Sequence, residues 1–269
     1  MVSAHPAARK CATHKDACRT VGESSEPPIL DAQSAVFLDV DGTLLEIASR
    51  PELVHVPSGL PALIARRADE REGALALISG RPLAQLDRLF HPWHGAAAGL
   101  HGLERRRADG TLERLLDSAS ETALNHIRPK LAALAGEGSG LLFEDKGVTI
   151  ALHYRAVPER EAEIRAYAKA LLAGSKTTLR LIAGKMVVEF QPATMDKGLA
   201  ITAFLAEPPF LGRRPIFVGD DTTDEDGFAE IRRRGGIAVR VGSPAATAAN
   251  YRVPTVGTVL DWLTRTNLP

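Results

Sequence analysis

Two aspartates, one residue apart, follow an apolar run and are the first candidates for chemistry. Val36–Leu38 is followed by Asp39, Val40 and Asp41, and then by a glycine and a threonine. Because side chains two positions apart in an extended chain point the same way, both carboxylates can address one spot beyond the strand. Two clustered negative charges are stabilised by a hard divalent cation with oxygen ligands, most often Mg²⁺. The alternative interpretation is an Asx-type turn at the end of a strand, without any ligand.

Two further apolar runs end in groups that suit the same chemistry. Ala74–Ile78 is followed by Ser79, Gly80 and Arg81, and Pro215–Gly219 is followed by Asp220 and Asp221. In an open parallel sheet, ligands bind outside the carboxyl ends of the strands. We therefore expect these strand endings to meet in one place.

These groups match the requirements of phosphoryl transfer. Asp39 and Asp220 would hold the metal ion directly, with the backbone carbonyl of Asp41 completing the protein ligands. Asp39 would attack phosphorus as the nucleophile, and Asp41 would serve as general acid and base. The hydroxyl of Ser79, the amide of Gly80 and the ammonium of Lys197 would bind the phosphoryl oxygens.

Each of these assignments has a structural alternative. Capping of the helix that follows would be enough to explain Ser79. Lys197 could be a solvated lysine in a first helical turn. A cation at that position opposes the helix dipole, which favours a nearby anion. Asp221 and Asp224 are candidates for hydrogen bonds behind the metal, but acidic residues there also favour a helix start without a ligand.

The elements that must position these residues alternate along the chain. Apolar residues recur at helical spacing in 60–72, and Pro82 suits the first turn of a helix that continues to Phe90. Helices are also expected at 197–205, about 225–233 and 259–263, and a further strand at 237–241. Strands that alternate with helices, without hairpin signals, predict an α/β fold with a parallel, doubly wound sheet.

The pattern changes between residues 108 and 190. Helices are expected at about 115–134 and 159–172, and short strands near 141, 148–154, 179–182 and 186–190. This arrangement predicts a compact α+β unit inserted into the larger fold. Residues 31–107 and 191–269 would form the main domain, and residues 1–30, which are polar and contain several prolines, a disordered tail.

Composition and charge give no support for nucleic acid, a membrane or zinc as a partner of this chain. The chain has 269 residues and a formal net charge of +0, so there is no global electrostatic argument for nucleic acid or an anionic membrane. The cysteines, Cys11 and Cys18, match no usual zinc spacing with His5 and His14. No apolar run approaches the roughly 20 residues of a membrane helix, and no secretory signal is evident. We expect a cytoplasmic monomer with a small-molecule substrate.

Four motifs resemble those of the haloacid dehalogenase-like (HAD) superfamily of phosphotransferases. They are DVDGT at 39–43, Ser79 after its apolar strand, Lys197, and GDDTTDE at 219–225. Haloacid dehalogenases proper lack the second aspartate, so Asp41 indicates phosphate chemistry. The resemblance implies a Rossmann-like core with a cap inserted between the serine and lysine motifs.

Further motifs resemble the trehalose-6-phosphate phosphatase family over about 31–263. They are ALISGRP at 76–82, GLHGLERR at 99–106, the pair Glu144 and Lys146, ALHYR at 151–155 and GKMVVE at 184–189. The resemblance implies Mg²⁺-dependent hydrolysis of trehalose 6-phosphate to trehalose and phosphate, a step of trehalose biosynthesis.

The resemblance also implies which residues bind the sugar. Cap residues matching Glu144, Lys146 and Glu189 recognise it in that family, and glucose hydroxyls need such a mixture of acceptors and donors. Taken alone, a Glu-x-Lys pair is more typical of a solvated turn. Arg81 and His101 are further candidates for substrate binding, and His153 and Arg155 for lining the same cleft.

Two departures and three alternatives stay open. Gln191 stands where relatives usually have a basic residue, so one charged contact would be missing, and the thirty-residue head has no assigned counterpart. The substrate could be another sugar phosphate, such as sucrose 6-phosphate, and Mn²⁺ or Co²⁺ could replace Mg²⁺. A non-catalytic regulator that binds a sugar phosphate is the alternative of another class.

Overall fold

The computed structural model describes residues 26–48, 53–174, 178–184, 186–242 and 246–265. The cysteines and most of the predicted disordered tail lie outside the described residues. Within the described ranges, no helix has the length and apolar character needed to cross a membrane.

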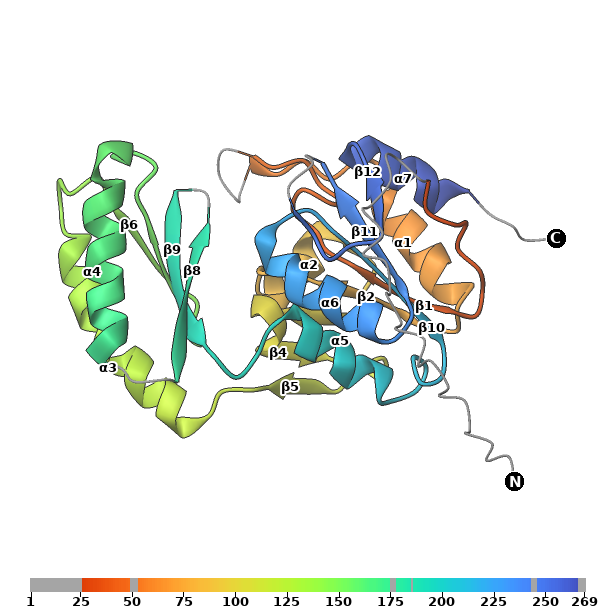
Figure 1. Ribbon diagram of the computed structural model, residues 1–269, viewed down its shortest axis with the longest axis horizontal. Coiled ribbons are helices and arrows are strands. Elements are labelled where there is room, and N and C mark those ends of the chain that lie inside the picture. The colour runs from red at the N-terminus through yellow and green to blue at the C-terminus, as the bar shows by residue number, and fades with distance from the viewer. Residues whose placement is uncertain (1–25, 49–52, 175–177, 185, 243–245, 266–269) are drawn as a thin grey trace, which may run out of the picture.

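The described chain forms two bodies, each built on its own sheet (Figure 1). The larger body contains an eight-stranded sheet in the order β12-β11-β10-β1-β2-β3-β4-β5. The strands from β12 to β3 are parallel, whereas β4 and β5 are antiparallel to their neighbours. The bounds are β1 (Ser34–Leu38), β2 (Leu75–Ile78), β3 (Ala96–Gly99), β4 (Glu104–Arg106), β5 (Leu112–Arg114), β10 (Arg214–Gly219), β11 (Ile237–Val241) and β12 (Tyr251–Val253).

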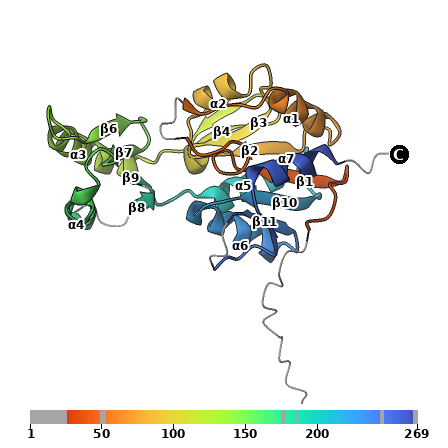
Figure 2. The same ribbon diagram turned by 90° about the horizontal axis from the view of Figure 1, so that it is seen from above.

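Helices cover both faces of this sheet (Figure 2). Val36 and Leu38 of β1 pack in one apolar cluster with residues of α1 (Leu60–Asp69), α2 (Leu83–Leu89) and α7 (Val256–Thr264). Ala35 and Phe37 pack on the other face with α5 (Lys197–Leu205) and α6 (Glu225–Arg233). Because successive strand residues point to opposite faces, a strand covered on both sides must be apolar throughout.

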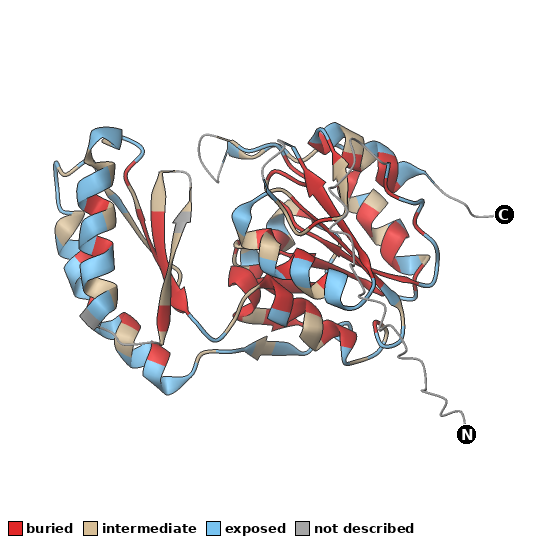
Figure 3. Ribbon diagram, viewed as in Figure 1, coloured by how far each residue is buried: buried red, intermediate tan, exposed pale blue. Residues whose placement is uncertain are grey.

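Burial follows this layering (Figure 3). Every residue of β1, β2 and β11 is buried, and apart from Ser34 and Arg240 these strands consist of apolar residues, as burial on both faces requires. The chemistry-bearing residues begin where β1, β2 and the largely buried strand β10 end. The interior strands therefore form a fixed platform for the side chains that follow them.

The smaller body is an antiparallel sheet in the order β6-β7-β9-β8, covered on one face by two helices. Its elements are α3 (Ser118–Leu134), β6 (Leu142–Asp145), β7 (Ile150–His153), α4 (Glu161–Gly174), β8 (Leu179–Gly184) and β9 (Val187–Pro192). Ile150, Leu152, Val188 and Phe190 pack against the helices. The alternate residues on β7 and β9 therefore occupy the opposite face, which lies toward the larger body in Figure 1.

The α/β fold class and the mostly parallel sheet are confirmed, and the expected helices are present with shifted ends. The sequence did not predict β3, β12 or the antiparallel pair β4 and β5. Both strands of that pair have three residues and consist mainly of charged side chains, so they carry no apolar period. β5 lies in the segment that we expected to belong to the insertion, and the proposed division at residues 108 and 190 stays a prediction.

Candidate active site

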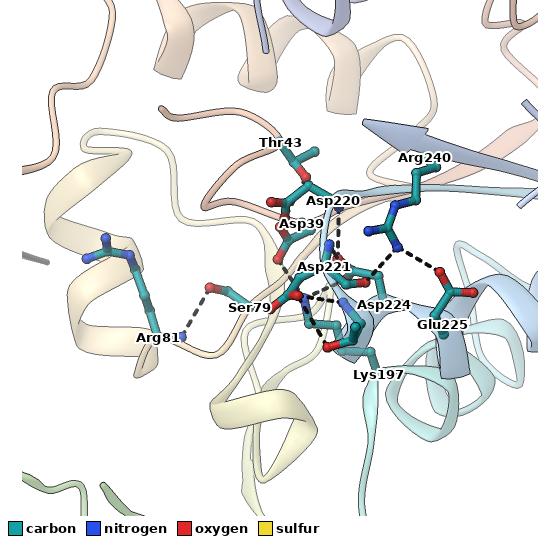
Figure 4. Close-up of polar contacts among 11 residues, drawn as sticks. Asp39, Thr43, Ser79, Arg81, Lys197, Asp220, Asp221, Asp224, Glu225 and Arg240 are labelled. Atoms are coloured by element: carbon teal, nitrogen blue, oxygen red, sulfur yellow. Dashed lines mark hydrogen bonds and ion pairs between the residues drawn. The ribbon is translucent and has the colours of Figure 1, made fainter. Parts of the chain in front are cut away.

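The ends of three neighbouring strands bring the predicted residues together (Figure 4). The strands β10, β1 and β2 are adjacent and parallel, so Asp220, Asp39 and Ser79 leave the same edge of the sheet. Lys197 reaches the same place from the first residue of α5. The convergence that we expected from three separate strand endings is thus present.

Lys197 is enclosed by two carboxylates. Its Nζ donates to Oδ1 of Asp39 and to Oδ1 of Asp224, both at 2.6 Å, and its side chain is only 3% exposed. Burial alone would lower the pKa of Lys197, but the charges of Asp224 and Asp39 reverse this and raise it above its ordinary value. The lysine therefore stays a cation in a buried position, and it compensates for part of the negative charge around it.

Asp224 supports the turn that follows β10. Its Oδ2 accepts hydrogen bonds from the amides of Asp220 and Asp221, both at 2.9 Å, while Oδ1 accepts from Lys197. A side chain at Gly219 would place its Cβ 2.4 Å from Cγ of Asp224, so glycine is required there. These contacts occupy both carboxylate oxygens and agree with a supporting role for Asp224. The side chain of Asp221 instead accepts from the amide of Thr222.

Asp39, Asp220 and Asp224 form an acidic cluster whose nearest oxygens all lie within 4.8 Å of one another. Burial raises the pKa of Asp39 well above its usual value, and Asp224 and Asp220 add to this, although Lys197 opposes it. Burial, with Asp224 next to it, raises the pKa of Asp220 to about 7. When all three carboxyl groups are ionised, the single ammonium of Lys197 leaves an excess of negative charge. These oxygen donors could therefore hold a metal ion.

Gly42 makes room for this cluster. Its φ of +81° lies in the left-handed region, and a Cβ there would lie 2.0 Å from Oδ2 of Asp220. A residue with a side chain would thus both strain the turn after Asp41 and displace Asp220. The glycine of the DVDGT segment is needed for close approach between the β1 and β10 endings.

Asp41 lies against Arg81 rather than inside the cluster. Nε of Arg81 donates to Oδ2 and Nη2 donates to Oδ1, both at 2.6 Å, in a bidentate ion pair. The carboxylate of Asp41 is therefore bound to a residue that follows the end of β2. Its predicted metal contact was through the backbone carbonyl, which this pairing leaves unaffected.

Ser79 and Gly80, which follow β2, pack against His101, which follows β3. The Ser79 hydroxyl accepts from the amide of Arg81 at 3.1 Å, and its carbonyl accepts from the amide of His101 at 2.9 Å. A Cβ on Gly80 would lie 2.8 Å from Nε2 of His101. His101 has a φ of 58°, and its buried Nδ1 has no hydrogen-bond partner. Burial, together with the nearby cations, lowers the pKa of His101 well below its usual value.

A cleft of about 260 Å³ lies between the two bodies and has walls from both. Residues of the larger body that line it include Asp41, Ile47, Val54, Gly80, Arg81, Pro82, Gln85 and His101, and those of the smaller body are Glu144, Lys146, His153, Arg155, Val187 and Glu189. All predicted sugar-binding residues are thus brought to this cleft.

The charged wall of the smaller body is set by strand register. Glu144 and Glu189 both pair with Ala151, one on each side, so the two carboxylates flank a small residue on one face of the sheet. Nζ of Lys146 lies 3.5 Å from Glu189 and 3.9 Å from Glu144. Nε2 of His153 lies 2.9 Å from Oε2 of Glu144, and this hydrogen bond lowers the pKa of Glu144.

Thr43 is a site residue whose role was not predicted from the sequence. Its hydroxyl donates to Oδ2 of Asp39 at 3.1 Å, while Lys197 binds the other oxygen, and the threonine is fully buried. The two donors fix the orientation of the Asp39 carboxylate. Its position four residues after Asp39, in a tight turn, was the available signal.

Comparisons with known proteins identify a family to which the chain is similar. A sequence model of the trehalose-phosphatase family matches residues 37–256. The chain is 44% identical to a probable trehalose-phosphate phosphatase of Sinorhizobium fredii over 78% of each chain. It is 40% identical to the trehalose-6-phosphate phosphatase of Escherichia coli, covering 89% of this chain and 88% of the other.

A solved structure supports the fold. The C-terminal domain of the C. albicans trehalose-6-phosphate phosphatase superposes with a TM-score of 0.76, covering 87% of this chain and 91% of that one. Sequence identity is 20%, so this likeness concerns the fold alone.

Proposed function

Because the chain belongs to the trehalose-phosphatase family, we propose that it hydrolyses trehalose 6-phosphate to trehalose and phosphate. The observation that carries this proposal is the cleft, in which Asp41 and Arg81 face Glu144, Lys146 and Glu189. The wall from the larger body lies next to the groups that phosphoryl transfer requires. The wall from the smaller body has the mixed charges that bind sugar hydroxyls.

In the first step, Asp39 attacks phosphorus and the bond between phosphorus and the sugar oxygen breaks. Asp41, whose carboxyl must exchange its ion pair with Arg81 for the sugar oxygen, donates a proton to the departing alcohol, which leaves as trehalose. In the second step, Asp41 accepts a proton from water, and the water oxygen displaces Asp39 from phosphorus. Inorganic phosphate and the free carboxylate result.

Fixed donors stabilise the phosphoryl group in both steps. Lys197, the hydroxyl of Ser79 and the amide of Gly80 supply positive charge and N–H or O–H groups where negative charge is concentrated. Lys197 and Thr43 also hold Asp39 in one orientation, at 2.6 and 3.1 Å. A nucleophile held in this way needs little reorganisation before attack.

The acidic cluster fits Mg²⁺, because its donors are carboxylate oxygens with excess negative charge. Asp39 and Asp220 would hold the ion with the backbone carbonyl of Asp41, and Asp224 and Asp221 would lie behind them. A bound ion would neutralise charge on the substrate phosphate and lessen the repulsion between that phosphate and Asp39.

The smaller body would act as a cap that selects the sugar. Glu144 and Glu189 offer acceptors, and Lys146 offers donors, on the face of the sheet toward the cleft. Arg81 and His101 complete the wall from the larger body. A substrate that left these charges unpaired would bind poorly, because a buried charge without a partner is costly.

Phosphate release from a panel of substrates tests the proposal. The panel contains trehalose 6-phosphate, sucrose 6-phosphate, glucose 6-phosphate and p-nitrophenyl phosphate, each with Mg²⁺ and with a chelator. We expect trehalose 6-phosphate to have the highest kcat/KM of the panel. We expect its hydrolysis with Mg²⁺ but not with the chelator. A preference for another sugar phosphate, or no release from any substrate, would contradict it. The cytoplasmic location and the monomeric state stay predictions from the sequence.

A further inference from the structure

Two linkers connect the smaller body to the larger one, and the second of them consists of residues 193–196. Arg180 lies where this second linker leaves the smaller body. It is near the start of β8 and pairs directly with Gln191 near the end of β9. After β9 the chain passes through residues 193–196 into α5, whose first residue is Lys197. Figure 1 shows this linker running between the two bodies. A side chain at this point can contact the sheet, the linker and the larger body together.

The guanidinium of Arg180 makes contacts of all three kinds. Nη2 donates to the carbonyl oxygen of Met195, in the linker, at 2.9 Å. Because a guanidinium has only donors, the amide oxygen of Gln191 is assigned toward it and accepts from Nε and Nη2 at 2.5 Å each. Nη1 lies 3.6 Å from Oδ2 of Asp226, on α6 of the larger body.

These contacts differ in strength. The side chains of Arg180 and Asp226 are 30% and 54% exposed, so their ion pair is screened by solvent. Gln191 is fully buried, and the hydrogen bonds to its amide and to Met195 are charge-assisted. Arg180 therefore fixes the linker to the sheet more firmly than it fixes the sheet to α6. The ion pair with Asp226 adds a weaker contact between β8 of the smaller body and α6 of the larger body.

Both ends of the attachment belong to the candidate site. Gln191 and Glu189 are two residues apart on β9, so they share the sheet face that borders the cleft. At the other end, Asp196 caps α5 by accepting from the amide of Leu199 at 2.8 Å. The next residue, Lys197, binds Asp39. Arg180 thus lies between the proposed sugar-binding wall and the proposed phosphate-binding lysine.

We propose that Arg180 is a positioning residue that holds the second linker, and with it the angle of the smaller body, so that one substrate molecule reaches both walls of the cleft. This inference rests on the proposed function. A disaccharide phosphate must contact Glu189 and the phosphoryl-binding groups at once, and small misplacement at either wall weakens catalysis. A small phosphate ester needs only the larger body.

The test compares Arg180→Met with a matched control, Arg165→Met. Arg165 lies on α4, pairs with Glu161 at 2.7 Å and has a side chain 33% exposed, against 30% for Arg180. Each full-length variant is assayed with Mg²⁺ on trehalose 6-phosphate and on p-nitrophenyl phosphate. Hydrogen exchange of the amides in 193–196 and the melting temperature are measured on the same samples.

We expect Arg180→Met to lower kcat/KM for trehalose 6-phosphate by about tenfold, the scale of one lost charge-assisted hydrogen bond. The value for p-nitrophenyl phosphate should change by less than about twofold, and the linker amides should exchange faster. Arg165→Met should change neither substrate nor the linker. Equal losses on both substrates, or unchanged linker exchange, would overturn the proposal.

Arg180→Lys separates position from charge, and it also replaces Arg180→Met if that variant does not fold. Lysine keeps the charge near His101 and the cleft but lacks the planar fork that binds Gln191 and Met195 together. We expect it to retain the linker defect. Full recovery by lysine would assign the effect to charge and refute positioning. If the wild type released no phosphate from trehalose 6-phosphate, the proposed function would fail, whereas linker exchange would still decide the role of Arg180.

Discussion

The charge excess in the acidic cluster predicts that Asp220→Asn stabilises the metal-free protein above neutral pH. Burial and Asp224 raise the pKa of Asp220 from 3.8 to about 7. At pH values between these two pKa values, Asp220 keeps its proton in the folded chain but has released it in the unfolded chain. The folded state thus binds more protons across this window, so the free energy of unfolding falls as pH rises through it. Asparagine does not titrate, so the free energy of unfolding of the variant should lack this part of the dependence on pH.

The size of the effect follows from the shift. A change from 3.8 to about 7 corresponds to about 4 kcal/mol, at about 1.4 kcal/mol per unit. Asp220 is partly accessible, and screening by solvent reduces this to about 2 kcal/mol. For a protein of this size, that difference raises the melting temperature by about 4–8 °C. The difference should vanish near pH 4, where the wild-type carboxyl is protonated.

Calorimetric melting of both proteins, in chelator at pH 4 and pH 8, tests this. With saturating Mg²⁺ at pH 8 the order should reverse, because only the wild type keeps both proposed carboxylate ligands and binding stabilises the folded state. A variant that melts at or below the wild type in chelator at pH 8 would refute the reasoning. So would a difference that is equal at both pH values.

Three other substitutions probe the cap, the cluster and the core. Glu144→Ala should raise KM for trehalose 6-phosphate about tenfold or more, with little effect on p-nitrophenyl phosphate, and equal losses in the two assays would exclude sugar recognition by this residue. Lys197→Met leaves buried carboxylates without their cation and should cost about 3–5 kcal/mol in urea unfolding in chelator at pH 8; an unchanged midpoint would contradict this. Phe204→Ala removes a ring packed 6.1 Å from Phe37 and 5.1 Å from Phe210, centroid to centroid. It should cost about 3–5 kcal/mol by the same method, and a loss below about 1 kcal/mol would mean that the core closes around the gap.

The elements that hold the site could be predicted because their sequences are constrained by burial. β1 is covered on both faces and has no exposed position, so its apolar run and the aspartates that end it are visible in the sequence. α1 likewise buries Leu60, Ile64 and Ala68 at helical spacing. The charged hairpin of β4 and β5 carries no such pattern, since its strands are held by edge pairing and by ion pairs such as that between Arg105 and Glu113.

Pairings between distant side chains could not be predicted in the same way. Arg81 and Asp41 are 40 residues apart, and only the adjacency of β1 and β2 brings them together. Gln191 was expected to leave a charged contact missing, yet Arg180 lies directly opposite on the neighbouring strand and brings a guanidinium to its side chain. Such contacts depend on which strands are neighbours in the sheet and on their register, and the local apolar pattern of a single sequence shows neither of these.

In the proposed reaction, Asp39 carries the phosphoryl group between trehalose 6-phosphate and water. The most direct measurement is a rapid acid quench of the enzyme mixed with Mg²⁺ and substrate labelled in the phosphoryl group. We predict label bound to the peptide that contains Asp39, removable by hydroxylamine as an acyl phosphate is, and absent from Asp39→Asn, which should keep its fold but release no phosphate. Phosphate release by Asp39→Asn at the wild-type rate, or label on another residue, would contradict the account.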